Sequence, residues 1–386
     1  MMARTCARGA AMASLLSPPP ATVLVLLAAA VSVAVGLPAI NVTTISFEEG
    51  YTPLFGQDNI LRSSDDRTVS LLLDRTTGSG FISSSMYQHG FFSASIKLPS
   101  DYTAGVVVAF YVSRPSVALS ALYIACMHIP SVRASNGDVF DKRHDELDFE
   151  FLGNIRGKPW RVQTNVYGNG SVHRGREERY VLPFDPTTEF HRYSILWTPA
   201  AVAFYVDDVP VREVRRSPAM AGDFPSKPMS LYATVWDASN WATSGGKYKV
   251  NYRYGPFVAS FTDLALAGCR VDDPPPGGNG NGGGIRMVTA LGCAAAEEAL
   301  RASEPAVMTV EKQQAMRRFR EQNMVYSYCY DTLRYPVPFP ECDVVESERR
   351  RFKDSGHLRF ALRQRQQRRP RPRRPRGPRP ITGTVV

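Results

Sequence analysis

The chain has 386 residues, 44% hydrophobic and 21% charged, which fits globular domains and excludes both a wholly disordered chain and a multi-span membrane protein. The formal net charge is +10, but residues 349–386 hold fourteen Arg and Lys against one acid, so the remaining residues together carry −3. The basicity therefore belongs to a tail, and it does not indicate a nucleic-acid-binding body.

Residues 1–36 are predicted to be a secretory signal peptide. Arg4 and Arg8 precede an apolar run at 23–35, interrupted only by Ser32, which is too short to span a bilayer. No other run reaches the roughly 18 to 20 apolar residues of a spanning helix. We therefore expect a secreted, extracellular protein without a membrane span. Asn41 and Asn169 each begin an Asn-X-Ser/Thr triplet and are candidate glycosylation sites in such a protein.

The chain from residue 37 to residue 268 is predicted to form one all-β domain. Short runs rich in Val, Ile, Phe and Tyr alternate with Gly, Pro, Asn or Asp; they lie at 90–98, 104–112, 162–167, 193–198, 202–206 and 229–236. This spacing is typical of an antiparallel sandwich or jelly roll. Asp207 and Asp208, between two such runs, predict a hairpin turn.

The most informative stretch is HDELDFEFLGN at residues 144–154. If it is a strand, Glu146, Asp148 and Glu150 lie on one face, and the other face is apolar: Leu147, Phe149 and Phe151. Three carboxyl groups in such a row repel one another and raise one another's pKa, which is costly for a purely structural strand. The alternative is an ordinary amphipathic strand with a solvated acidic face.

A carboxylate row of this kind suits retaining glycoside hydrolysis. That reaction needs two carboxyl groups about 5 to 5.5 Å apart. The Cα atoms of Glu146 and Glu150 would be about 13 Å apart on a strand, a gap that two Glu side chains leaning inward on a concave sheet can largely close. Asp148 would hydrogen-bond the nucleophile, and its negative charge would help to keep the acid protonated.

The stretch HDELDFEFLGN resembles the active-site motif of glycoside hydrolase family 16. With its flanking residues it is similar to the plant xyloglucan endotransglucosylase/hydrolase family, and GNIRGKPW, YGNGS and GREERY resemble the divergent third subgroup of that family. Other matching segments are GFFSASIKL at 90–98, QTN at 163–165, FDP at 184–186, YSILW at 193–197, WAT at 241–243 and RYP at 334–336.

The resemblance implies a concanavalin-like β-jelly-roll sandwich in which Glu146 is the nucleophile, Asp148 the auxiliary acid and Glu150 the general acid/base. It implies a xyloglucan donor, a xyloglucan or oligosaccharide acceptor, and no cofactor or metal. His144 matches a family position but precedes the face that carries the chemistry, so we assign it a supporting role at most.

Substrate-binding residues follow from the same matching. Gln163 and Asn165 share one sheet face by alternation, and the family uses such amides beside the nucleophile; surface polarity is the alternative. Trp236 and Trp241 are expected to stack on glucosyl rings. The alternative is that one of the two belongs to the hydrophobic core. Arg334 resembles an Arg that contacts the acceptor side.

Residues 114–135 depart from the family pattern. In the family the strand at 106–112 runs almost directly into 136–140, whereas here an apolar stretch with Cys126 intervenes. We interpret residues 114–135 as a doubtful insertion that consists of retained intron sequence. If the segment belongs to the native protein, it would crowd the cleft.

Residues 269–345 are predicted to form a small disulfide-stapled C-terminal extension. The Gly-rich stretch at 274–284 cannot hold regular structure, whereas 294–303 and 310–324 are helix-prone. The cysteines of this part suggest two local disulfides, most simply Cys269 with Cys293 and Cys329 with Cys342. Zinc is the competing interpretation, but the chain has no CxxC and no nearby His pair.

Residues 346–386 are predicted to be a basic disordered tail that can bind acidic wall polymers such as pectin.

The function that the motifs favour is a xyloglucan endotransglucosylase of the cell wall. The alternatives are a predominantly hydrolytic xyloglucanase and a non-catalytic carbohydrate-binding sandwich. A nucleic-acid or membrane-surface binder is a further class, and the signal segment and the acidic body argue against it.

Overall fold

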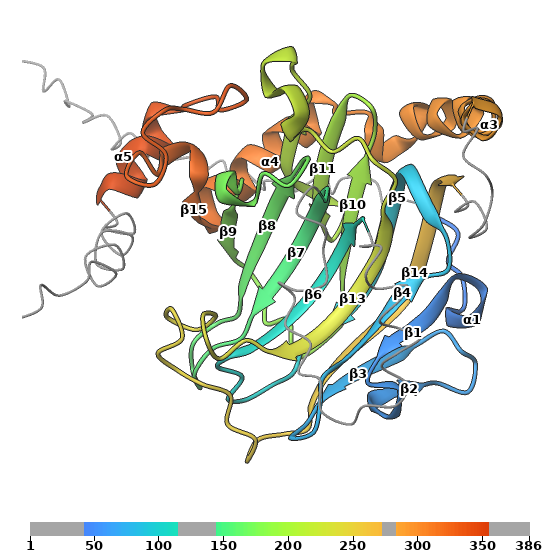
Figure 1. The fold of residues 1–386 in the computed structure, drawn as a ribbon. Helices are drawn as coiled ribbons and strands as arrows, with labels where there is room; N and C mark the ends of the chain where they lie inside the picture. Colours follow the sequence, from blue (N-terminus) through green and yellow to red (C-terminus); the bar gives the residue numbers. More distant parts are fainter. Residues whose placement is uncertain (1–41, 115–143, 272–282, 355–386) are drawn as a thin grey trace, which may run out of the picture. The chain divides into compact units, whose positions relative to one another are not determined.

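The computed structural model describes residues 42–114, 144–271 and 283–354. Two antiparallel sheets form most of this part of the chain and pack against each other (Figure 1). In spatial order the first sheet holds β1 (Tyr51–Phe55), β4 (Ser79–Ser83), β13 (Ser230–Asp237), β6 (Val106–Ser113), β7 (Glu146–Leu152), β8 (Arg161–Tyr167), β9 (Glu178–Val181) and β15 (Met324–Ser327). The second holds β12 (Val209–Arg215), β11 (Ala201–Val206), β10 (His191–Trp197), β5 (Met86–Lys97), β14 (Phe257–Val271), β3 (Val69–Leu73) and β2 (Ile60–Arg62). The predicted all-β jelly-roll sandwich is confirmed.

In the described ranges the α-helices are fewer than the strands, and α3, with 20 residues, is the longest of them. The α-helices are α1 (Phe47–Gly50), α3 (Gly283–Ala302), α4 (Val310–Asn323) and α5 (Glu346–Asp354), and the 3-10 turns are η1 (Gln57–Asn59), η3 (Val172–Arg174), η4 (Pro218–Asp223), η5 (Glu304–Ala306) and η6 (Tyr328–Tyr330). Among the helices in the described ranges, none combines the length and the apolar character that a membrane crossing requires.

The hydrophobic core lies between the two sheets, and period-two alternation supplies it. On β13 the inward residues Leu231, Ala233 and Val235 are fully buried in this core, while Trp236 lies on the opposite face, partly buried. Burying each large apolar side chain is worth about 1.5 to 3 kcal/mol, so a sheet with one uniformly apolar face is held firmly against its partner. The second face of the eight-stranded sheet is thereby left for polar and aromatic side chains.

The hairpin between β11 and β12 forms at the predicted residues. Asp207 and Asp208 have φ angles of 47° and 62°. Positive φ at both central residues is the requirement of the type I′ turn that joins twisted antiparallel strands, and Asp tolerates it.

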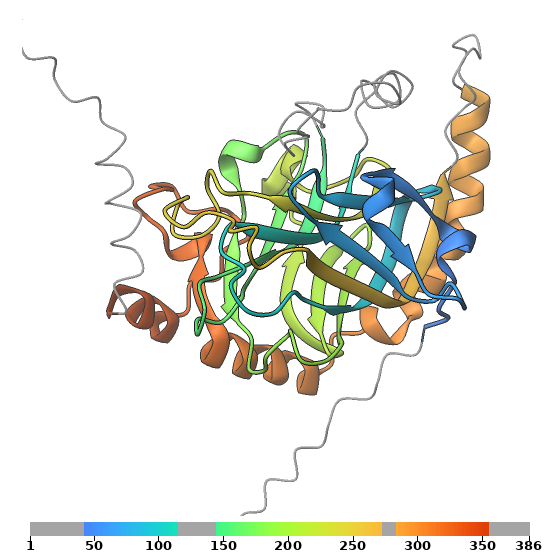
Figure 2. The same cartoon turned by 90° about the horizontal axis from the view of Figure 1, so that it is seen from below.

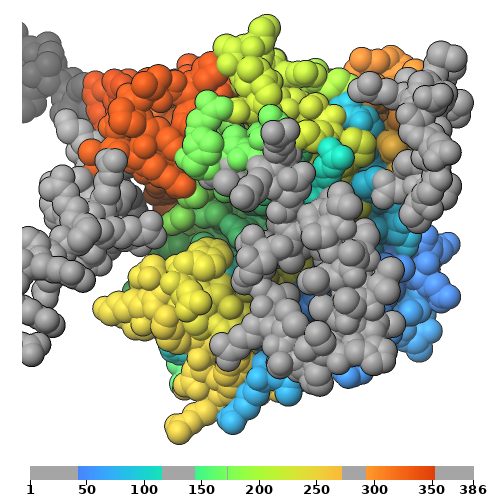
Figure 3. All heavy atoms as spheres, viewed as in Figure 1, coloured from blue at the N-terminus to red at the C-terminus, as the bar shows by residue number. Residues whose placement is uncertain are grey.

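The C-terminal extension packs on the sandwich through helices, a strand and disulfides. Helix α3 contacts β14 and β5, and α4 contacts β12, so both cover strands of the seven-stranded sheet (Figure 2). Strand β15 pairs with β9 at the edge of the other sheet, where the space-filling view shows the red C-terminal segment beside the green strands (Figure 3). The disulfides join Cys269 to Cys293 and Cys329 to Cys342, as predicted.

Two sequence expectations about this extension are wrong in part. Residues 346–354, expected to begin the disordered tail, form α5; Phe352 is buried against Tyr330, whose hydroxyl donates to Glu348 at 2.6 Å. One aromatic anchor and one buried hydrogen bond thus order a segment whose composition is mostly charged. Gly283 and Gly284, expected to end the structureless connector, belong to α3.

Several predictions lie outside the described residues. They are the signal peptide at 1–36, Asn41, the insertion beyond Arg114, most of the connector and the tail beyond residue 354. At the boundary of the insertion, Arg114 N donates to Asp145 O at 3.2 Å, and Ser113 lies opposite Glu146. The strands on either side of residues 115–143 are therefore paired neighbours.

Candidate active site

Strand β7 has the two faces that alternation predicts. Leu147, Phe149 and Phe151 are fully buried between the sheets. The Phe149 ring meets the rings of Phe204 and Tyr193 edge to face, with centroids 5.2 and 5.6 Å apart. These contacts with the second sheet fix β7, so Glu146, Asp148 and Glu150 all project from its other face. We call these three residues the carboxylate row.

The backbone at the start of β7 is fixed by Asp145, to which sequence reasoning gave no role. Its side chain is almost fully buried and accepts hydrogen bonds from the backbone N–H groups of Asn169 at 2.6 Å, Ser226 at 2.7 Å and Lys227 at 2.9 Å. A buried carboxylate that accepts several N–H donors is strongly held. Asp145 therefore joins the first residue of the row to two loops from other parts of the chain.

The two neighbouring strands, β6 and β8, each place a residue opposite every carboxyl group of the row. Glu146 lies opposite Ser113 on β6 and Tyr167 on β8. Asp148 lies opposite Tyr111 and Asn165. Because directly opposed residues share a sheet face, these side chains surround the row.

Gln163 and Asn165 lie on the predicted face, but their partners differ from the expectation. Gln163 lies opposite Glu150, and its Nε2 donates to Glu150 Oε2 at 2.6 Å. The Asn165 amide donates to the Tyr167 hydroxyl at 2.6 Å. Gln163 therefore contacts the expected acid/base rather than the expected nucleophile, and Asn165 reaches the surroundings of Glu146 through Tyr167.

Burial and mutual repulsion raise the pKa of every carboxyl group in the row. Burial, with the charge of Glu150 added to it, raises the pKa of Glu146 to about 8. Burial and the charge of Glu177 raise the pKa of Glu150 to about 7, whereas burial and both glutamates raise that of Asp148 well above its usual range. Three such groups cannot all be ionised at neutral pH, so the row holds protons in common.

Asp148 is the most deeply buried carboxyl group of the row. A hydrogen bond joins the Asp148 and Glu146 side chains, and it lowers the pKa of Glu146. A protonated Asp148 can donate that bond and stabilise an ionised Glu146. Asp148 and Glu150 repel each other when both are charged, and the charge of Glu177 also raises the pKa of Glu150.

Aromatic side chains line the same face of the sheet. Tyr111 and Tyr232 stack with ring centroids 5.0 Å apart and an interplanar angle of 10°. Trp236 packs beside them, partly buried, and Trp241 follows in the next loop with 43% of its surface exposed. Trp236 is thus on the face that alternation predicts, and Trp241 is accessible to a ligand.

His144 lies closer to the row than its sequence position suggested. Its Nε2 is 3.7 Å from Glu146 Oε2, and its ring is tilted against that of Tyr167 at a centroid distance of 6.4 Å. It precedes β7, but the backbone that Asp145 holds brings it beside the first carboxyl group.

Arg334 lies in an ion pair of the C-terminal extension. Its Nη1 is 2.9 Å from Glu177 Oε2, and the same oxygen is 3.2 Å from Arg179 Nη2. Arg179 in turn donates from Nε to Gln163 Oε1 at 2.7 Å. The sequence alone singled out neither Glu177 nor Arg179, because the segment GREERY that contains them is simply a run of charged residues. Their position beside the C-terminal extension becomes evident only from the pairing of β15 with β9.

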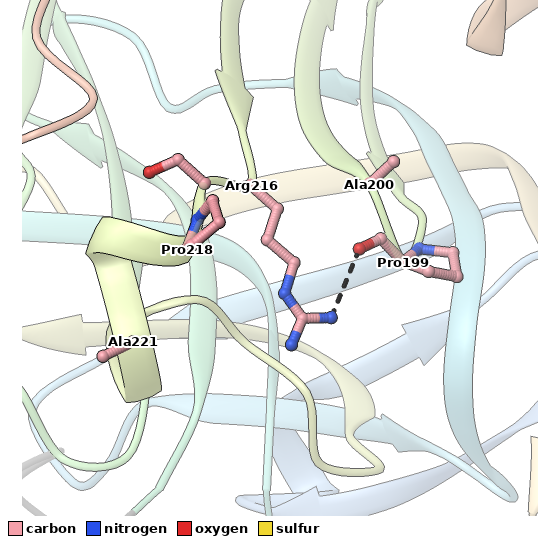
Figure 4. Close-up of a pocket in the computed structure, with 6 residues that line it drawn as sticks. Pro199, Ala200, Arg216, Pro218 and Ala221 are labelled. Carbon is pink, nitrogen blue, oxygen red and sulfur yellow. Dashed lines mark hydrogen bonds between the residues drawn. The ribbon is translucent and has the colours of Figure 1, made fainter.

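A separate pocket of about 500 Å³ lies between the β10–β11 turn and the segment after β12 (Figure 4). Its lining residues are Pro199, Ala200, Arg216, Ser217, Pro218 and Ala221. Arg216 Nη1 donates to the Pro199 carbonyl at 3.5 Å across it. The lining contains no carboxyl group and no residue of β7, so this pocket is not the carboxylate site.

Metal ligation has no evident place in the described ranges. Within residues 42–114, 144–271 and 283–354, no three His, Cys, Asp or Glu side chains gather in a way that could hold a metal ion. The chemistry that the carboxylate row offers is proton transfer and nucleophilic attack by oxygen.

Two family models match this chain. The family model of glycosyl hydrolases family 16 matches residues 47–121 and 128–254, and that of the xyloglucan endo-transglycosylase C-terminus matches residues 296–342. A β-glucanase of Bacillus licheniformis is similar in structure with a TM-score of 0.40 and 18% identity, covering 56% of this chain and 91% of that one.

Two relatives from Arabidopsis thaliana are much more similar in sequence. Probable xyloglucan endotransglucosylase/hydrolase protein 30 is 56% identical over 338 residues, which cover 86% of this chain and 89% of the relative. Probable xyloglucan endotransglucosylase/hydrolase protein 29 is 57% identical over 320 residues, which cover 83% of each. The chain therefore belongs to the xyloglucan endotransglucosylase/hydrolase family of enzymes, within glycosyl hydrolases family 16.

Proposed function

We propose that this enzyme is a xyloglucan endotransglucosylase that cuts xyloglucan and rejoins the fragment to another chain by a retaining double displacement. The observation that carries the proposal is the carboxylate row: Glu146 and Glu150 project from one face of β7 with Asp148 between them, above a fully buried apolar floor. A non-catalytic binding sandwich has no use for three buried carboxyl groups at such electrostatic cost.

The reaction assigns one role to each carboxyl group. In the first step the Glu146 carboxylate attacks the anomeric carbon, the glycosidic C–O bond breaks, and the proton of Glu150 passes to the leaving oxygen. In the second step Glu150 removes the proton of an acceptor hydroxyl, whose oxygen bonds to the anomeric carbon while the bond to Glu146 breaks. Asp148 donates a hydrogen bond to Glu146 and holds it in the attacking orientation.

Transfer rather than hydrolysis requires an acceptor site that outcompetes water. We propose that the side of the row near Glu150 forms this site, because Gln163, Arg179 and Arg334 place amide and guanidinium donors there. Trp236 and Trp241 supply the aromatic faces on which glucosyl rings stack. Predominant hydrolysis is the second candidate, and water takes the acceptor's place in it.

One assay separates the candidates. Xyloglucan is incubated with a fluorescent xyloglucan oligosaccharide, and transfer moves the label into polymer, whereas hydrolysis releases reducing ends without labelled polymer. Glu146→Gln should abolish both products while xyloglucan binding persists. Glu298→Gln, an isosteric change at a side chain 71% exposed on α3, should leave both rates unchanged. Binding with full turnover in Glu146→Gln would reject the assignment.

We also propose that the protein is secreted to the cell wall, and Asn169 offers a direct check. It is exposed in the loop after β8, with φ of 50° and its Oδ1 2.8 Å from Lys227 Nζ. Glycosylation there should appear as a mass increment on its tryptic peptide that peptide N-glycosidase removes.

The basic residues at 355–386 are proposed to hold acidic wall polymers, so their removal should lower salt-sensitive retention on pectin without changing turnover.

A further inference from the structure

A continuous series of polar contacts runs from the C-terminal extension to Glu150. Its first part crosses two strands: Gln163 Nε2 on β8 donates to Glu150 Oε2 at 2.6 Å, and Arg179 Nε on β9 donates to Gln163 Oε1 at 2.7 Å. Both bonds are short, and Gln163 is almost fully buried, so the amide cannot rotate without losing a partner on each side. The orientation of Glu150 is therefore linked to that of Arg179.

The second part of the series reaches from the sandwich to the extension. One oxygen of Glu177 is 3.2 Å from Arg179 Nη2 and 2.9 Å from Arg334 Nη1. The Glu177 side chain is only 12% exposed, whereas those of Arg179 and Arg334 are 40% and 38% exposed, so solvent screens these pairs in part. Glu177 thus joins a guanidinium group of the sandwich to one of the extension.

The extension also holds each guanidinium group by an aromatic ring. Arg179 lies over the Tyr326 ring at 5.3 Å, and Tyr326 is paired with Arg179 across β15 and β9. Arg334 lies over the Tyr335 ring at 5.0 Å. The strand pairing at the sheet edge, visible beside β9 in Figure 1, therefore fixes the far end of the series.

The charges along the series act on Glu150 in opposite directions. Beyond the effect of burial, Glu177 raises the pKa of Glu150, and Arg179 lowers it. On β6, β7, β8 and β13, the other titratable or charged residues that share the sheet face of Glu150 by alternation are Glu146 and Asp148 on β7, Tyr111 on β6, Arg161 and Tyr167 on β8 and Tyr232 on β13. None of these belongs to the extension, so a change confined to Glu177 or Arg334 isolates the contribution of the extension.

We propose that Glu177 is a positioning residue through which the C-terminal extension, by way of Arg334, controls the orientation and protonation of Glu150. The inference deepens the proposed function, on which it rests, by giving the extension a part in acid/base chemistry. With Arg334 in place, the negative charge of Glu177 is partly neutralised, and Glu150 keeps a proton that it can still release. Without Arg334, the full charge of Glu177 acts on Glu150.

Two substitutions test this with opposite signs. Glu177→Gln removes the negative charge and should lower the pKa of Glu150 by about half to one unit, whereas Arg334→Ala should raise it by a smaller amount. Arg334→Lys keeps the charge and should leave the pKa near its wild-type value. Glu298→Gln is the control for a distant isosteric change. Thermal melting of each variant shows whether it folds. If Arg334→Ala does not fold, the pKa of Glu150 in Arg334→Lys is compared with that in Glu177→Gln instead.

The first readout is the pKa of Glu150 itself, measured by ¹³C NMR of glutamate-labelled protein and assigned with Glu150→Gln. Shifts of opposite sign in Glu177→Gln and Arg334→Ala support the inference, and shifts that are absent or of equal sign overturn it. The second readout is the alkaline limb of kcat/KM for xyloglucan transfer. If the NMR pKa moves but this limb does not, the inference stands and the acid/base role of Glu150 is rejected.

Discussion

Glu178 and Arg320 form a two-pronged ion pair that joins strand β9 to helix α4. Arg320 Nη1 donates to Glu178 Oε2 at 2.6 Å, and Arg320 Nη2 donates to Oε1 at 3.0 Å. Arg212 on β12 brings a second cation within 3.6 Å, and the Ser327 hydroxyl of β15 donates to Glu178 at 2.9 Å. One buried carboxylate thus connects both sheets and the C-terminal extension.

Loss of the Glu178 charge should detach the extension. Burial raises the pKa of Glu178, but the charges of Arg320 and Arg212 outweigh it and lower the value to about 2. Glu178→Gln leaves two buried guanidinium groups without their anion, which should cost about 3 kcal/mol in the free energy of unfolding. Chemical denaturation at pH 7 measures this, and Glu298→Gln should lose almost nothing.

The same pair gives an acid dependence with a defined sign. The folded pKa of about 2 is below the ordinary 4.5, so Glu178 stabilises the fold above pH 4.5, and this contribution is lost as the pH falls towards 2. The destabilisation caused by Glu178→Gln should therefore shrink on acidification. A difference that stays constant from pH 6 to pH 3 would contradict the assignment.

The carboxylate row should have the opposite pH dependence. The pKa of Glu150 is raised from 4.5 to about 7, so the unfolded chain loses this proton first and stability falls as the pH rises from 4.5 to 7. Glu150→Gln abolishes that penalty and should stabilise the protein by about 3 kcal/mol at pH 8, with little effect at pH 4.5. Thermal melting across this range measures the difference, and activity is expected to be lost throughout.

Phe149 should be the most sensitive residue of the apolar floor. It is fully buried and contacts the rings of Phe204 and Tyr193 of the second sheet. Phe149→Ala should lower the free energy of unfolding by about 3 to 5 kcal/mol, and Phe149→Leu by clearly less, because the cavity is smaller. Urea denaturation of both variants checks the order. Equal losses would mean that β7 is not held by this contact.

The Cys329–Cys342 disulfide closes a loop that contains Arg334. Its sequence separation of 13 predicts about 3 kcal/mol of stabilisation from loop closure. In the double variant Cys329→Ser/Cys342→Ser, trypsin should cleave after Arg334 much faster than in the wild type. In Cys269→Ser/Cys293→Ser this cleavage should stay slow, since that disulfide joins α3 to β14.

Alternation and residue type were sufficient to predict the sandwich and the faces of β7. The strand has one apolar face and one acidic face, so it can be buried in only one way. The apolar residues are Leu147, Phe149 and Phe151, and the acidic residues are Glu146, Asp148 and Glu150. Local cysteine spacing likewise predicted both disulfides.

The contacts that sequence reasoning missed are long-range. Glu177 meets Arg334, and Arg179 meets the Tyr326 ring, only because the extension, some 145 residues later, places β15 beside β9. Asp145 acquires its donors from the loops at Asn169 and Ser226. No local pattern reveals which distant N–H or guanidinium group a charged residue will meet.

The pairing of β15 with β9 also matters for a molecule that must stay dispersed among polysaccharides. An uncovered β9 would offer its backbone N–H and C=O groups to any other extended chain, including a second copy of the enzyme. By occupying that position the extension guards against self-association, so an enzyme truncated before Met324 would be expected to aggregate even with its carboxylates intact.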